Sequence, residues 1–163
     1  MKGLIILLLT LLSSSCSSEK VLSTAPYLSD KVRMASESND SSTLSDDDYD
    51  QITAYLSQGR WRWIAFYPIL KQSPFLGATS FQEGLDIAMA YALPENPEMV
   101  LKFVNQSNVN KLCNMPFIEP TPDERERYFL QTRAALNRLT TRKEWGEKCL
   151  AVLENNYKTT QEK

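Results

Sequence analysis

The stretch TPDERERYFLQTRAALNRL, residues 121–139, carries the clearest helix signal in the chain. Thr121 is a favourable N-cap, Pro122 suits the first helical position, and Glu124 completes a capping box with Thr121. Side chains that suit a buried helix face then recur at helical spacing: Tyr128, Thr132, Ala135 and Leu139. The stretch therefore predicts an amphipathic helix with a sharply defined start.

Five further segments carry related signals. Ser45 and the acidic residues after it suit a helix start, a capping box joins Ser80 to Glu83, and Asn96 precedes a proline in the first turn. No segment alternates convincingly in the manner of a strand. We therefore predict an all-α domain, a compact bundle or irregular array of five to six short helices, over 45–59, 60–71, 80–93, 95–105, 121–139 and 141–157.

The N-terminal stretch GLIILLLTLLSSSCSSEK, residues 3–20, has the pattern of a secretory signal peptide. Lys2 precedes the apolar run 4–12, which has less than half of the about 20 residues that a membrane-spanning helix needs. With small residues before Cys16, the pattern resembles that of bacterial lipoprotein precursors. The resemblance implies a signal peptide over residues 1–15 and acylation of Cys16. A secreted protein with a free or paired Cys16, and a short membrane anchor, are the alternatives.

The resemblance also implies a location. Ser17, rather than an aspartate, follows the cysteine, which resembles the default signal for the outer membrane in Gram-negative lipoproteins. We expect a lipid-anchored protein of the bacterial cell envelope, at the outer membrane and facing the periplasm. Residues 17–45 contain nine serines and few large apolar groups. Together with the lipidated Cys16, they are predicted to form a flexible tether over 16–45. A single helical domain is predicted over 46–163.

Two cysteines lie in the predicted domain. In an oxidising periplasm, such a pair is most simply a disulfide, here Cys113 to Cys149. Two buried reduced thiols are the main alternative, and redox catalysis or metal binding is a weaker one. The spacing is not CxxC, and the chain has no histidine for a usual zinc site. We expect neither a metal nor a cofactor.

Charge and composition exclude several classes of partner and of catalytic mechanism. Removal of the predicted signal peptide would remove Lys2 and leave 17 basic and 20 acidic residues. The resulting net charge of −3 argues against a nucleic-acid partner. The lack of histidine excludes a histidine-assisted nucleophile, and no GxSxG or phosphate-binding glycine loop is present. Helix-end carboxylates are expected to be capping or solvated groups, with a glycosidase-like pair as the alternative: Glu83, Asp86, Glu95 and Glu98.

Two surfaces are candidates for contact with a partner. Arg60, Trp61, Arg62 and Trp63 combine residue types enriched in binding hot spots, although the tryptophans also suit a core. The second candidate is Phe117 and Ile118, two apolar residues in a proline-stiffened loop that can also line the core.

The resulting layout resembles the helical, disulfide-bridged pilotin lipoproteins of secretion systems and small periplasmic immunity proteins. This likeness implies a non-enzymatic lipoprotein that binds another protein in the envelope and is anchored to the membrane by its lipid. A carboxylate-dependent cell-wall or envelope hydrolase is the alternative. No catalytic residue is assigned.

Overall fold

The computed structural model describes residues 24–161, with side chains over 27–160. The predicted signal peptide and Cys16 lie outside these residues. Within them the chain is helical and has no strand, so the all-α prediction is confirmed. The helices are α1 (Thr24–Ser38), α2 (Asp46–Ser57), α3 (Trp61–Leu70), α4 (Thr79–Glu95), α5 (Pro97–Val100), α6 (Val109–Leu112), α7 (Pro122–Asn137) and α8 (Lys143–Gln161), with a 3₁₀ turn η1 (Phe75–Gly77) before α4.

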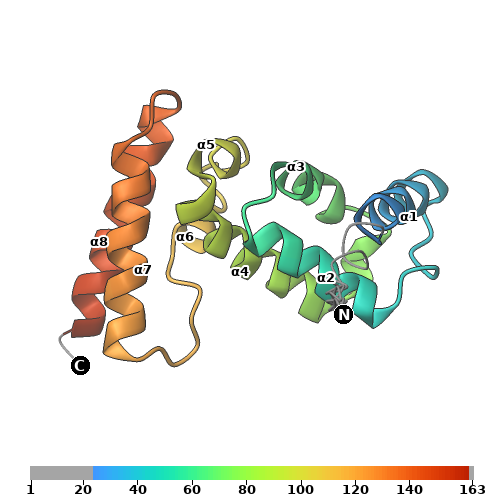
Figure 1. Ribbon diagram of the computed structural model, residues 1–163, viewed down its shortest axis with the longest axis horizontal. Coiled ribbons are helices and arrows are strands. Elements are labelled where there is room, and N and C mark those ends of the chain that lie inside the picture. Colours follow the sequence, from blue (N-terminus) through green and yellow to red (C-terminus); the bar gives the residue numbers. More distant parts are fainter. Residues whose placement is uncertain (1–23, 162–163) are drawn as a thin grey trace, which may run out of the picture.

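Helix α4 is the centre of the arrangement. It contacts α2, α3, α5, α6, α7 and η1, while α7 and α8 form an antiparallel pair at one end of the molecule and α1 lies at the other (Figure 1). A helix with so many neighbours must be apolar on several sides. Residues on more than one side of α4 are accordingly buried: Phe81, Leu85, Ala88, Met89, Ala90, Ala92 and Leu93.

The helix starts follow the predicted caps at Ser45, Thr121 and Asn96, although Asn96 caps α5 without a side-chain hydrogen bond, and they differ at Ser80. Ser45 and Thr121 both form capping boxes, with Asp48 and Glu124 respectively. The predicted capping box of Ser80 is wrong, because α4 already begins at Thr79 and has no side-chain cap. The 3₁₀ turn leads directly into α4, so Ser80 lies inside the helix rather than before it.

The structure corrects the predicted tether. Residues 24–38 form α1, so the helical domain begins before residue 46. Leu28, Val32 and Ala35 are almost completely buried in the main core, and the Lys31 ammonium lies 2.6 Å from the carboxylate of Asp48. These three apolar residues recur at helical spacing, but the serines and charges between them lower the average hydrophobicity of the segment. Packing against the rest of the domain compensates the entropy of ordering α1.

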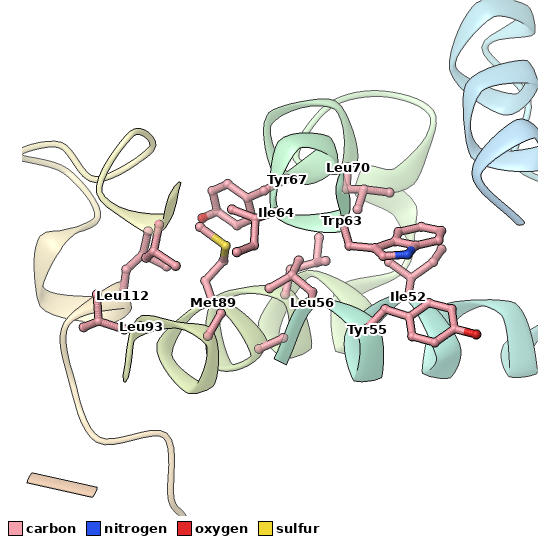
Figure 2. Close-up of a cluster of buried hydrophobic side chains, with 14 of the residues drawn as sticks. Ile52, Tyr55, Leu56, Trp63, Ile64, Tyr67, Leu70, Met89, Leu93 and Leu112 are labelled. Carbon is pink, nitrogen blue, oxygen red and sulfur yellow. The ribbon is translucent and has the colours of Figure 1, made fainter. Parts of the chain in front are cut away.

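The main core lies where α2, α3 and α4 meet. Trp63 packs near Ile52 and Tyr55, and Met89 of α4 lies below Ile64 and Tyr67 of α3 (Figure 2). Figure 2 also shows Leu93 beside Leu112, which connects α4 to α6. Trp63 is thus a core residue, which is one of the two interpretations of its sequence pattern, and not part of an exposed binding surface.

The sulfur atoms of Cys113 and Cys149 lie at disulfide-bonding distance, and the two Cα atoms are 5.0 Å apart. Both cysteines are fully buried. Cys113 directly follows α6 and Cys149 lies in α8, so this pair connects the central helices to the C-terminal helix. None of the helices in the range 24–161 is long and apolar enough to cross a bilayer.

Candidate binding groove along α4

Three adjoining hollows lie along one side of α4. Their volumes are about 590 Å³ between α2 and α4, about 500 Å³ between α4 and α7, and about 390 Å³ between α4 and residues 116–120. Together we call them the α4 groove. Of the residues that α4 contributes, five recur every three or four positions and form one stripe along the helix: Ser80, Gly84, Ile87, Tyr91 and Pro94. Phe81, Ala88 and Glu95 line the hollows directly beside this stripe.

Tyr91 is the one residue that lines all three hollows. Its side chain is 37% exposed, and Ile87, one turn earlier, is 40% exposed. The Tyr91 ring meets Phe117 edge to face with ring centroids 5.7 Å apart, and Phe117 meets Tyr128 in the same way at 5.5 Å. Such T-shaped contacts are favourable and fix ring orientation. The floor of the groove is therefore a connected aromatic row.

The row is held in place from beneath. The Tyr128 hydroxyl donates a hydrogen bond to the carbonyl of Ala90 at 2.8 Å, which ties α7 to α4. Burial raises the pKa of the Tyr128 phenol, so it stays a neutral donor. Burial likewise raises the pKa of Tyr91, and the nearby Glu124 carboxylate adds to this effect. The groove thus has a preformed and uncharged aromatic floor.

The edges of the groove are mainly acidic. Asp46 and Asp50 line it from α2, and the carboxylate of Glu124 is held at the N-terminus of α7 by the Thr121 backbone N–H and hydroxyl. These two hydrogen bonds lower the pKa of Glu124, so this group remains charged. Five acidic residues and one basic residue line the three hollows: Asp46, Asp50, Glu95, Glu119, Glu124 and Arg127.

The structure brings one predicted surface to this groove and places the other elsewhere. Phe117 lies half-buried in the groove, and Ile118 beside it is 92% exposed. The basic and aromatic cluster at the start of α3 lines none of the three hollows. Trp61 is 58% exposed with the guanidinium of Arg62 over its ring at 5.3 Å. Arg60 instead lies over the Tyr55 ring at 4.1 Å.

The four carboxylates considered for catalysis have separate surroundings. The Asp86 carboxylate accepts hydrogen bonds from the Tyr67 hydroxyl at 2.8 Å and the Lys71 ammonium at 3.0 Å. Glu98 accepts from the threonines that follow α7, mainly from the Thr141 hydroxyl, and these bonds lower its pKa. Glu83 is exposed and lines none of the hollows described above, whereas Glu95 lies at the α7 end of the groove.

A different pair, Glu95 and Glu124, lines the same hollow. A general acid needs a raised pKa, but the pKa of Glu124 is lowered by its capping bonds. This geometry suits helix capping rather than proton donation. Among the described residues, no group of three or more histidine, cysteine, aspartate or glutamate side chains is placed to hold a metal ion.

Ile87 and Tyr91 were not predicted as site residues. The sequence of α4 nevertheless held a signal for them, because these two large apolar side chains lie outside the apolar face that Leu85, Ala88 and Ala92 form at helical spacing. An apolar stripe beyond the core-facing one indicates either a further packing neighbour or an exposed surface. Comparison of this chain with protein-family models, curated proteins and solved structures finds no match.

Proposed function

We propose that this chain is a lipid-anchored protein of the bacterial cell envelope that binds another protein through the α4 groove and catalyses no reaction. The observation that carries the proposal is the position of Tyr91. It is a partly exposed aromatic residue at the junction of three hollows, and it is already oriented by its contact with Phe117.

Aromatic residues at the centre of a preformed hollow are the usual source of binding energy in protein interfaces. The row from Tyr91 through Phe117 to Tyr128 is fixed by ring contacts and by the hydrogen bond to Ala90, so little side-chain freedom remains to be lost on binding. Pro116 and Pro120 limit the backbone freedom of the adjoining wall in the same way. This preorganisation supports a role in binding.

The anchor part of the proposal is supported by the sequence before α1. Cys16 follows the short apolar run 4–12 and the small residues Ser14 and Ser15. Only residues 17–23 separate it from α1, a length that spans at most about 25 Å when fully extended. The helical domain would thus lie close to the membrane surface. Cys16→Ser should abolish incorporation of labelled fatty acid, and unchanged labelling would contradict the acylation of Cys16.

Binding can be tested in cells with a photo-crosslinking amino acid in place of Ile87. We expect a discrete adduct with another protein, because this side chain is exposed in the groove. Met34 is the matched control position, because it is an exposed apolar residue on α1. The same adducts from both positions, or none from Ile87, would contradict binding through the groove.

A further inference from the structure

We propose that the occupant of the α4 groove is a cationic amphipathic helix of the partner protein. This inference rests on the proposed function and adds the chemistry of the bound segment. It follows from the length of the groove, its charge and the type of backbone that it can accept.

The length of the groove matches a short helix. Its stripe on α4 runs from Ser80 to Pro94, and a helix rises 1.5 Å per residue, so the stripe extends over about 21 Å. A partner helix of about 14 residues covers this length. Its apolar side chains, three or four positions apart, would meet Ile87, Tyr91 and Phe117 along the floor.

Gly84 allows a close approach in the middle of the stripe. A Cβ atom added there would make one ordinary van der Waals contact, with the methyl group of Thr53 at 3.7 Å, so there is room for a small group beside this residue. A partner side chain can therefore approach the backbone of α4 at this point.

The charge of the edges selects a basic partner. Asp46 and Asp50 lie on the α2 side, and Glu119 and Glu124 lie on the opposite side. The one basic residue, Arg127, lies close enough to Glu124 to help lower its pKa. A helix with lysine or arginine on both flanks of its apolar face would meet carboxylates at both edges.

The lack of a strand edge in residues 24–161 favours a helix over an added β-strand. An extended peptide that binds by adding a β-strand needs a strand edge to pair its N–H and C=O groups, and the described part of the chain, 24–161, contains no strand. A helix satisfies these groups internally and needs only side-chain contacts. The groove supplies such contacts through its aromatic floor and acidic edges.

Two model peptides test this inference. Both have 14 residues and the same leucine and alanine face, but one has lysine on its polar face and the other has glutamate. The full-length chain is held in phosphatidylcholine nanodiscs, with empty nanodiscs as the reference, and binding is followed by fluorescence anisotropy. We expect the lysine peptide to bind at least about tenfold more tightly than the glutamate peptide, and more weakly as salt is added.

Variants assign the binding to the groove. Asp50→Lys with Glu119→Lys should weaken binding of the lysine peptide about tenfold, since two edge charges are reversed. Glu37→Lys with Glu83→Lys is the matched control, because it makes the same change of charge at exposed positions that line none of the three hollows. Gly84→Leu should also block binding by filling the groove, whereas Gly77→Leu, at another open glycine, should not. Equal binding of both peptides, no binding of the lysine peptide, or no effect of the groove variants would overturn the inference.

The adduct formed from position 87 separates this inference from the proposed function. Mass spectrometry of the adduct identifies the crosslinked segment of the partner. A segment with basic residues flanking a helical apolar stripe supports the inference. An acidic or proline-rich segment would overturn it and leave protein binding in place, whereas the lack of any adduct would overturn both.

Discussion

Replacement of Leu28 by alanine tests whether α1 is part of the folded domain. Leu28 is 1% exposed and packs into the main core with Val32 and Ala35. Truncation of a fully buried leucine removes its apolar contacts and leaves a cavity, at a cost of about 2–5 kcal/mol. Helix α1 lies at one end of the molecule (Figure 1), where its surroundings can relax around the cavity, so we expect a value in the lower half of this range, about 3 kcal/mol.

The assay is urea unfolding of the full-length chain followed by tryptophan fluorescence. Since Trp63 lies in the same core, the transition reports on the packing that Leu28 joins. With a urea m-value of about 1–3 kcal/mol/M, a loss of about 3 kcal/mol lowers the urea midpoint by about 1–3 M. Met34→Ala on the same helix is the control, because this side chain is 66% exposed and its loss should change stability by less than about 0.5 kcal/mol. If both variants unfold like the wild type, α1 is not packed on the core and the reasoning is refuted.

Three further predictions concern stability. Replacing Cys113 and Cys149 with alanine should lower the free energy of unfolding by about 3–4 kcal/mol, because the pair closes a segment with a sequence separation of 36; equal urea midpoints for both forms would contradict this. The lowered pKa of Glu98 stabilises the fold above about pH 4.5, and this contribution is lost as the pH falls through the lower folded-state value. Glu98→Gln should therefore show a smaller decrease of the melting temperature between pH 6 and pH 3, and an unchanged profile would refute this role. Gly59→Ala should cost more than about 1 kcal/mol, since its φ is +69° and the new Cβ would lie 2.6 Å from Glu95 Cβ; wild-type stability by thermal unfolding would be inconsistent with this geometry.

The fold class could be predicted from the sequence because apolar residues recur at helical spacing in several segments and two helices carry clear start signals. The capping boxes of Ser45 and Thr121 are formed as expected, since they depend only on residues three positions apart. Helix α1 was missed because its stability depends on distant partners rather than on local propensity. Its buried face consists of only a few apolar residues in a serine-rich segment, and a sequence without a known core gives no reason to order it.

The candidate site was only partly predictable for a related reason. Trp61 and Trp63 have the same residue type and lie two positions apart, yet one is exposed and the other is buried. Phe117 was identified as a candidate from its loop, but the hollow beside it arises only when α7 packs against α4. Tyr91 gains its central position from the same packing, which no local pattern encodes.

The most direct test of the central claim compares two tyrosines. Tyr91→Ala removes the residue at the junction of the three hollows, whereas Tyr27→Ala removes a tyrosine of α1 that is 64% exposed and lies outside them. The affinity of each full-length variant is measured for the partner identified by crosslinking from position 87, after circular dichroism has shown that both are folded. A central aromatic residue contributes about 2 kcal/mol or more, so Tyr91→Ala should weaken binding about 30-fold or more, and Tyr27→Ala should bind like the wild type. If Tyr91→Ala binds as tightly as Tyr27→Ala, the α4 groove is not the binding surface.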